Sequence, residues 1–387
     1  MLSMTSSELP TGIGVMARVE RLVEHHDQTA RPVRGRGSVT NRSGRFEANA
    51  RILFDDGWTD GNRADDGSGQ IRTSVTDEPA RRIITRNESP DIGFDRSINP
   101  YRGCEHGCSY CFARPTHAYM GLSPGLDFET RLFAKPDAAR LLERELAAPG
   151  YKVRSIAMGT NTDPYQPIER ERRITRQILE VLARCNHPVG IVTKNALIVR
   201  DIDILAPMAA KGLARVALSV TTLDGKIARA IEPRASTPGK RLAAIKALSD
   251  AGIPTGVSVA PVIPGLTDNE MEAILEAASN AGAKSASYIA LRLPLEVRDL
   301  FVESLLTHFP DRADRVMSLI AQMREGRHYQ AEFGKRMRGT GPLADLIAKR
   351  FHLAIARLGL NRQRVAPRCD LFQPPRNSRQ PDLFDGL

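Results

Sequence analysis

The sequence predicts an α/β fold in which six strand–helix units form an open or partial (β/α)6 barrel. Between about residues 92 and 309, short β-branched apolar runs alternate with helical stretches. The strand runs are continuously apolar, as expected for a parallel sheet that is buried on both faces. Glycine follows the helical stretches in "AAKGLARV", "SDAGIPTG" and "SNAGAKSA", where it would end a helix. A doubly wound sheet is the alternative, and the spacing alone does not separate the two.

Two kinds of residue pattern predict the individual elements of this region. Short runs rich in β-branched and apolar residues predict strands at 96–101, 155–160, 189–194, 215–222, 255–263 and 285–293. Apolar residues at helical spacing predict helices at 172–185, 202–211, 240–251, 269–281 and 295–308. The first strand stands directly before a cluster of cysteines, and each later strand is followed by one helix.

Composition divides the whole chain into four regions. These are a basic, weakly ordered N-terminal extension (1–90), the core domain (91–310), a helical C-terminal extension (311–360) and a Pro-rich tail (361–387). The first region is disordered or irregular in this prediction because Gly, Arg, Asp and Ser dominate it without sustained periodicity. The third region contains helices at 313–324 and 342–358.

Two segments combine arginines with features that suit nucleic acid. The N-terminal extension carries Arg31, Arg34, Arg36, Arg42 and Arg45 with glycines between them. That composition fits an arm lying on a phosphate backbone, and it fits a solvated linker equally well. In the helical extension, Tyr329 and Phe333 stand within the basic stretch 324–338. They could stack on bases or cover the edge of a core.

Charge and hydropathy limit the class of protein. The net charge is +10 over 387 residues, which suits an anionic partner, most plausibly nucleic acid, or reflects an arginine-rich proteome. The sequence has no run of about 18 apolar residues, so it predicts no membrane span. The N-terminus lacks a basic head followed by an apolar stretch, so we expect a cytoplasmic protein without a signal peptide.

Three of the five cysteines lie within eight positions, in "NPYRGCEHGCSYCFARP". Cys104, Cys108 and Cys111 have the spacing C-x3-C-x2-C, which favours a metal or redox site over a disulfide framework. Soft thiolates suit an iron–sulfur cluster or zinc, and zinc would need His106 or His117 as a fourth ligand. Three cysteines on a four-iron cluster would leave one iron open to a substrate. Three structural free thiols are a further alternative.

This loop, with Tyr110 just before the third cysteine, resembles the radical S-adenosylmethionine (radical SAM) superfamily. The position of the loop, after the first strand of a six-unit domain, agrees with this resemblance. The segments "TKNALIVRDIDIL" and "LSVTTLD" and the stretch "IEPRASTPGKRLAAIKALSDAGI" are similar to the subgroup that includes spore photoproduct lyase. The resemblance covers roughly residues 92–310.

The resemblance implies an enzyme with two cofactors. Cys104, Cys108 and Cys111 would ligate three irons of a [4Fe–4S] cluster, and S-adenosylmethionine would chelate the fourth. An electron from a cellular donor would cleave S-adenosylmethionine to methionine and a 5′-deoxyadenosyl radical, which abstracts a hydrogen atom from a substrate. With the basic segments, the substrate expected is nucleic acid, in DNA repair or modification. The alternatives are a peptide or small-molecule substrate, or a nucleic-acid-binding protein with structural zinc or an inactive cluster.

The remaining cofactor contacts are expected where the barrel strands end. The candidates are Tyr110, Thr160, Asn161, Asp163, Lys194, Ser219, Thr221 and Arg234. "GTNTD" stands in place of the superfamily's common Gly-Gly-Glu, so its polar groups could take the ammonium group of S-adenosylmethionine. An Asx turn at Asp163-Pro164 is the simpler interpretation. Lys194 could pair with the carboxylate of S-adenosylmethionine or be a solvated strand end.

Two further features concern the substrate and the partners. The lyase is thought to use an additional cysteine as hydrogen donor, but no cysteine lies between Cys111 and Cys185 here. Cys185 falls in a predicted helix as a structural thiol, so the sequence does not support the lyase's own repair reaction. Gln380–Phe384, "QPDLF", resembles the peptide by which bacterial repair proteins bind the sliding clamp. A similar "DLF" at 370–372 could serve instead, or both copies could fold back onto the barrel.

Overall fold

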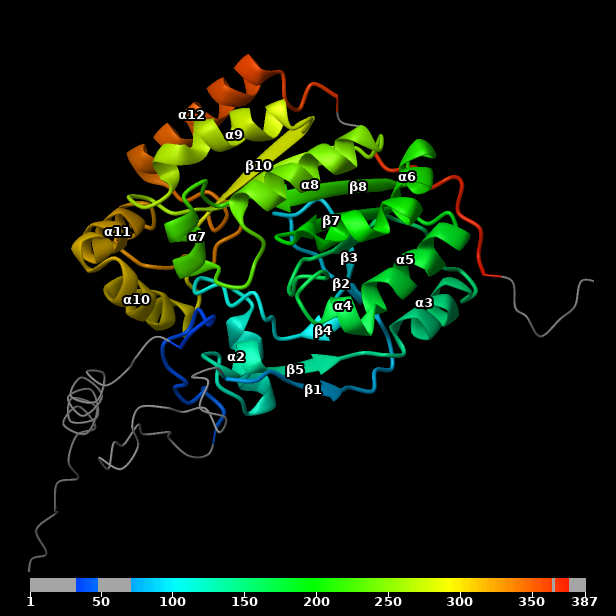
Figure 1. The fold of residues 1–387 in the computed structure, drawn as a ribbon, viewed down its shortest axis with the longest axis horizontal. Helices are drawn as coiled ribbons and strands as arrows, with labels where there is room; N and C mark the ends of the chain where they lie inside the picture. Colours follow the sequence, from blue (N-terminus) through cyan, green and yellow to red (C-terminus); the bar gives the residue numbers. More distant parts are fainter. Residues whose placement is uncertain (1–32, 48–70, 364–365, 376–387) are drawn as a thin grey trace, which may run out of the picture.

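The computed structural model describes residues 33–47, 71–363 and 366–375 (Figure 1). Its centre is a seven-stranded sheet in the order β10-β9-β8-β7-β6-β3-β2. The strands are β2 (Ile84–Arg86), β3 (Arg96–Ile98), β6 (Ile156–Met158), β7 (Val189–Thr193), β8 (Ala214–Ser219), β9 (Thr255–Val262) and β10 (Ser285–Ala290). All neighbours pair in parallel except β2, which runs antiparallel to β3. The six parallel strands are those predicted, and the sheet is open between β2 and β10 in the described chain.

Helices cover the outer side of this sheet, as Figure 1 shows. Those predicted in the core domain are α5 (Ile174–Arg184), α6 (Ile202–Ala210), α8 (Pro238–Asp250), α9 (Met271–Asn280) and α10 (Val297–His308). The helical extension contains α11 (Pro310–Gln322) and α12 (Gly341–Leu358). The glycines expected to end helices do so: Gly212, Gly252 and Gly282 have φ of 73°, 75° and 100°, which glycine adopts without strain.

Several short elements have no counterpart in the sequence prediction. They include the helices α2 (Asp127–Thr130), α3 (Ala138–Leu146), α4 (Glu169–Arg172) and α7 (Gly225–Ile231). They also include a three-stranded sheet in the order β1-β5-β4, formed by β1 (Ser74–Asp77), β5 (Arg131–Ala134) and β4 (Tyr101–Arg102), of which only Tyr101 falls in a predicted strand (96–101). Strand β1 is mostly exposed and polar, so its sequence carries no periodic apolar signal.

The described ends of the chain lie on opposite sides of the molecule. In Figure 1 residues 33–47, coloured dark blue, lie beside α2 and α10, whereas residues 366–375, in red, run along the other side. Leu371 and Phe372 pack against the main core, so the "DLF" copy at 370–372 folds back onto the domain. The second copy, Gln380–Phe384, lies outside the described residues. None of the helices in the described part of the chain is long and apolar enough to cross a membrane.

Candidate functional site

The cysteine loop follows β3 and β4 and is contacted by the segments that follow β6, β7 and β8. Ser109 N donates to Ile231 O at 3.1 Å, and Arg234 N donates to His106 O at 3.2 Å. Cys104 and Cys108 are buried, Cys111 is partly exposed, and all five cysteines of the chain are free thiols. The cysteines therefore lie where the parallel strands end, as the barrel prediction requires.

A buried ion pair fixes the cysteine loop against the segment before α2. The Arg114 guanidinium is fully buried and pairs with Glu129, itself fully buried, at 2.5 Å. Arg114 Nε also donates to Cys108 O at 2.9 Å, and Nη1 donates to the carbonyl oxygens of Pro124 and Gly125. Because one planar guanidinium binds four acceptors, it fixes the backbone at the second cysteine relative to the segment before α2.

The N-terminal segment, residues 33–47, closes over the same loop. The amides of Gly37 and Ser38 donate to the Glu129 carboxylate at 2.9 and 2.8 Å. A Cβ on Gly37 would lie 1.6 Å from Gly107 O, so only glycine allows this approach. Arg36 is buried and donates to Glu129 O at 2.9 Å.

These contacts change the interpretation of the arginine run. Arg42 pairs with Glu303 in the middle of α10 at 2.8 Å, and Arg45 pairs with Glu296, directly before that helix, at 2.5 Å. The expectation of a phosphate-binding arm is therefore not met by Arg36, Arg42 or Arg45, because a loop and a helix of the chain itself already bind them. Arg34 is exposed, and Arg31 lies outside the described residues.

Two amide side chains hold the loop from the side of β6. Gln166 accepts from Glu105 N at 2.9 Å and donates to Gly103 O at 3.1 Å. Asn99 Oδ1 accepts from Asn161 N at 3.2 Å and from Thr160 Oγ1 at 3.5 Å. The segment "GTNTDPYQ" thus lies directly beside the cysteine loop, with the Asn161 side chain half-buried.

The thiols suit an iron–sulfur cluster better than a single metal ion. Burial raises the pKa of all three, to about 12 for Cys108, and Asp163 and the two other thiols also raise that of Cys104. No three His, Cys, Asp or Glu side chains of the described chain converge on a point that could hold one ion. Convergence is needed for zinc, whereas the thiolates of a four-iron cluster each bind a different iron.

Both ring nitrogens of His106 have partners, whereas His117 has a partner on Nε2 and none on its buried Nδ1 among the described residues. His106 Nδ1 lies 3.4 Å from Asp163 Oδ2, and its Nε2 accepts from Asn195 Nδ2 at 3.2 Å. His117 Nε2 lies 3.0 Å from Arg131 O. Burial lowers the pKa of both rings, to about 4 for His117. The donor set that is left, three soft thiols in one loop, fits a [4Fe–4S] cluster.

Asp163 connects three parts of the site. Its carboxylate accepts from Thr193 Oγ1 and Lys194 N, both at 2.7 Å, and from Tyr165 N at 2.9 Å. With His106 as a further neighbour, its oxygens are committed to the chain itself. The structure therefore makes Asp163 the anchor of the turn after β6, which is the Asx-turn interpretation of this residue.

A second buried carboxylate, Glu232, lies beside three of the candidate residues and Arg241. It accepts from Thr221 Oγ1 at 2.7 Å, from the Tyr110 hydroxyl and from Arg241, and Lys194 Nζ lies 4.0 Å away. Burial alone would raise the pKa of Glu232, but Arg241, Lys194 and the two hydroxyls lower it to about 2. The carboxylate is therefore ionised, and it fixes Tyr110 and Thr221 beside Lys194.

The remaining candidates lie around this group. Strand β8 ends at Ser219 rather than at residue 222, so Thr221 belongs to the loop beyond it. Ser219 accepts through its carbonyl from Arg241 Nη1 at 3.0 Å. Arg234 pairs with Glu105 at 3.1 Å. Glu129, Arg114, Gln166 and Arg241 were not predicted, because their roles depend on partners distant in the sequence.

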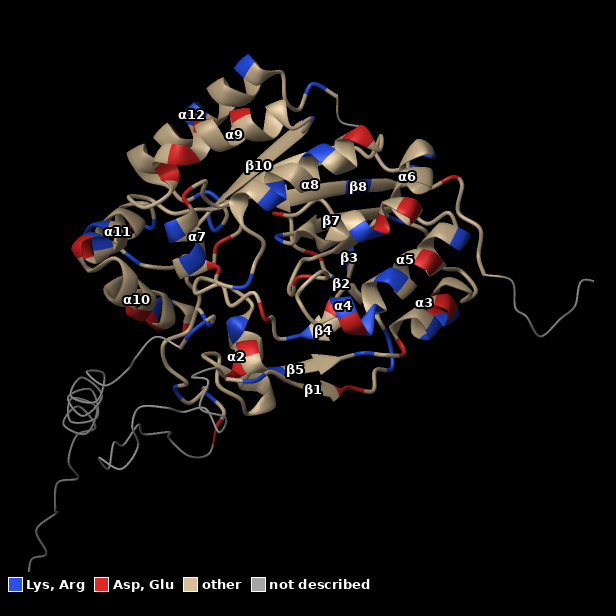
Figure 2. Ribbon diagram, viewed as in Figure 1, with Lys and Arg blue, Asp and Glu red and all other residues tan. Residues whose placement is uncertain are grey.

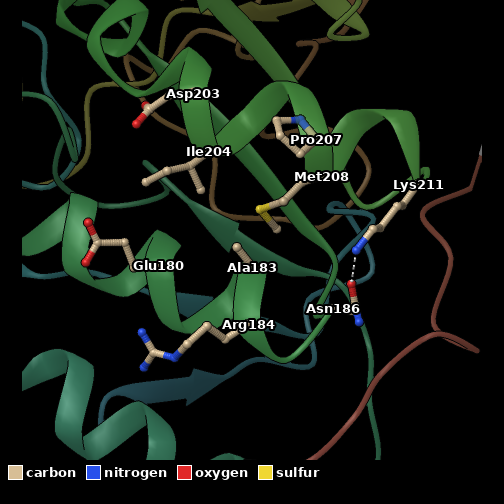
Figure 3. Close-up of a pocket in the computed structure, with 9 residues that line it drawn as sticks. All are labelled: Glu180, Ala183, Arg184, Asn186, Asp203, Ile204, Pro207, Met208 and Lys211. Atoms are coloured by element: carbon tan, nitrogen blue, oxygen red, sulfur yellow. Dashed lines mark hydrogen bonds between the residues drawn. The ribbon is translucent and has the colours of Figure 1, made fainter.

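A groove lies elsewhere, on the outer helices. Figure 3 shows a groove of about 370 Å³ between α5 and α6, lined by Glu180, Ala183, Arg184, Asn186, Asp203, Ile204, Pro207, Met208 and Lys211. None of the candidate residues lines it. The chemistry indicated by the cysteine loop is therefore separate from this groove.

Comparisons with known proteins agree with this geometry. The model of the radical SAM superfamily matches residues 98–278. An uncharacterized protein of Mycobacterium tuberculosis is 36% identical over 260 residues, covering 67% of this chain and 75% of that protein. One of Methanocaldococcus jannaschii is 28% identical over 191 residues, covering 49% of this chain and 68% of that protein. The structure of spore photoproduct lyase complexed with dinucleoside spore photoproduct has a TM-score of 0.52 at 15% identity, covering 74% of this chain and 80% of that one.

Proposed function

This chain belongs to the radical SAM superfamily, and from that premise we propose that Cys104, Cys108 and Cys111 hold the [4Fe–4S] cluster with which it cleaves S-adenosylmethionine. The observation that carries the proposal is the C-x3-C-x2-C loop beside the segments after β6, β7 and β8. When bound, the cluster supplies one electron, from a cellular donor, that splits S-adenosylmethionine into methionine and a 5′-deoxyadenosyl radical.

The chain's own residues bind and orient S-adenosylmethionine in this proposal. The ammonium group of Lys194, which donates to Ala260 O at 3.3 Å and lies 4.0 Å from Glu232, pairs with the carboxylate of S-adenosylmethionine. The half-buried Thr160 and Asn161 take its amino group. Tyr110, Ser219 and Thr221 form the adjoining wall, and Arg234 is the charged group at its edge. Asp163 acts by positioning, because its oxygens already bind Thr193 and Lys194.

We infer nucleic acid as the substrate class. The net charge of +10 supports this inference, as does a fold shared with a lyase that was solved with a dinucleoside photoproduct. Figure 2 shows Lys and Arg interspersed with Asp and Glu over the helices of the described chain. Recognition therefore has to come from particular side chains at the mouth of the site rather than from a uniformly basic face.

Anaerobic reconstitution tests the cluster. Wild-type protein should bind iron and sulfide and form 5′-deoxyadenosine from S-adenosylmethionine and dithionite. Cys104→Ala, Cys108→Ala and Cys111→Ala should each lose most of the iron, while Cys185→Ala and Cys369→Ala should retain it. His106→Ala should keep the iron too, whereas it would release zinc bound through that ring. Iron binding that survives all three single changes would overturn the assignment.

A further inference from the structure

An exposed aromatic ring and an arginine lie together beside the cysteine loop. Phe112 follows Cys111 directly, and its side chain is 43% exposed. Arg292 stands two residues after β10, and its guanidinium carbon lies 4.4 Å from the centroid of the Phe112 ring. The pair thus joins the proposed cluster loop to the end of the last parallel strand.

The guanidinium of Arg292 differs from those of the structural arginines nearby. Arg114, Arg241 and Arg324 each donate to carbonyl or carboxylate oxygens of the chain. Arg292 makes no hydrogen bond or ion pair with the described residues, although it is only partly exposed. Burial lowers the pKa of this side chain. A partly buried cation without an anion is unfavourable unless a ligand supplies the anion.

A second ring stands in the same neighbourhood. Phe333 is 56% exposed, and Arg336 lies over it at 4.6 Å from the centroid. Arg336 is already bound to Asp91 and to Ser89 Oγ at 2.5 Å. Arg336, Asp91 and Tyr329 all lie close enough to Arg292 to affect its pKa, as does Cys111. Of these two neighbouring arginine–phenylalanine pairs, only that of Arg292 and Phe112 has an arginine without a hydrogen bond or ion pair to the described residues.

We propose that Phe112 and Arg292 form a nucleotide-binding site at the mouth of the enzyme. A base of single-stranded or unpaired nucleic acid stacks on the open face of Phe112, and Arg292 binds a phosphate beside it. Arg292 covers the other face of the ring, and its N–H donors have no acceptor among the described residues. The inference rests on the proposed function, because it places the substrate next to the loop that would hold the cluster.

Binding of a fluorescently labelled single-stranded oligonucleotide to the reconstituted full-length enzyme tests the site. Anisotropy should show Phe112→Leu weakening binding about tenfold with an unchanged salt dependence, and Phe112→Trp retaining binding. Arg292→Gln should reduce the slope of log K against log salt by about 0.7, the loss of one phosphate contact. Arg357→Gln is the matched control, since Arg357 is exposed on α12, 3.8 Å from Glu276, and its slope should stay that of wild type.

Several outcomes would overturn the site. These are no binding of the oligonucleotide by wild-type enzyme, wild-type affinity in Phe112→Leu, or equal slopes for Arg292→Gln and Arg357→Gln. Loss of affinity in Phe112→Trp as well would show that Phe112 only supports the loop. Formation of 5′-deoxyadenosine by wild-type enzyme without nucleic acid tests the proposed function separately. Absence of that product with the binding pattern intact would refute the function and leave the nucleotide site.

Discussion

The two ends of the parallel sheet are held together by different kinds of contact. At the carboxyl ends of the strands, buried carboxylates such as Glu129 and Glu232 each bind several donors from distant segments. At the amino ends, the Tyr151, His187 and Phe372 rings pack together at centroid distances of 5.4 to 5.9 Å. Buried charges are costly and add little net stability, so carboxylates that each bind several distant segments indicate that loop geometry is what they maintain.

The largest effect is expected from leaving a carboxylate unpaired at the carboxyl end. Arg241→Met should lower the free energy of unfolding by about 3–5 kcal/mol, because Glu232 would keep its buried charge without its main partner. Urea unfolding followed by circular dichroism measures this. The double variant Glu232→Gln with Arg241→Met should be more stable than Arg241→Met alone. If Arg241→Met is as stable as wild type, water must reach the Glu232 carboxylate.

The two ends should also lose stability in different pH ranges. Burial lowers the pKa of His187 to about 4 from 6.5, so the stability that its neutral ring contributes is present above pH 6.5 and lost as the pH falls toward 4. Glu232, with its pKa lowered to about 2 from 4.5, contributes stability above pH 4.5 that is lost toward pH 2. Each contribution is on the order of 3 kcal/mol.

Matched variants separate these two ranges. His187→Gln should flatten the dependence of the unfolding free energy on pH between 6.5 and 4, and Glu232→Gln should flatten it only below 4.5. His117, whose pKa is also about 4, still titrates in both variants. Identical pH profiles for wild type and His187→Gln would contradict the assignment of the upper range to the amino end.

A smaller effect is expected where the described tail meets the amino end. Phe372 is half-buried against Tyr151 and His187, and Gln373 N donates to Cys185 O at 2.9 Å. Phe372→Ala should cost about 1–2 kcal/mol, less than a fully buried ring, without changing iron content. Loss of the cluster in this variant would mean that the two ends are coupled through the sheet.

The difference between the ends also explains what the sequence could predict. The six parallel strands and the C-x3-C-x2-C loop could both be predicted from the sequence, because each corresponds to a local pattern of residues. The contacts that hold the loop are not local: Gly37 and Arg36 reach Glu129 more than 90 positions away. The glycines around Arg36 suited a phosphate-binding arm or a solvated linker, whereas Gly37 permits close backbone packing against Gly107. No sequence pattern singled out Arg292, because its place in the proposed nucleotide site depends on its having no hydrogen bond or ion pair with the described residues, which only the structure shows.

The smallest effect is expected in the groove of Figure 3, between the outer helices α5 and α6. Its charged groups already have partners: Lys211 donates to Asn186 Oδ1 at 2.8 Å, and Asp203 pairs with Arg176 at 2.6 Å. Because none of these charged groups is left without a partner, we expect a charged ligand to gain little by leaving water for this groove. Ala183→Met, which narrows the groove, should change stability by no more than about 0.5 kcal/mol. It should leave oligonucleotide binding and 5′-deoxyadenosine formation at wild-type levels, and a fall in either would show that function extends to the outer helices.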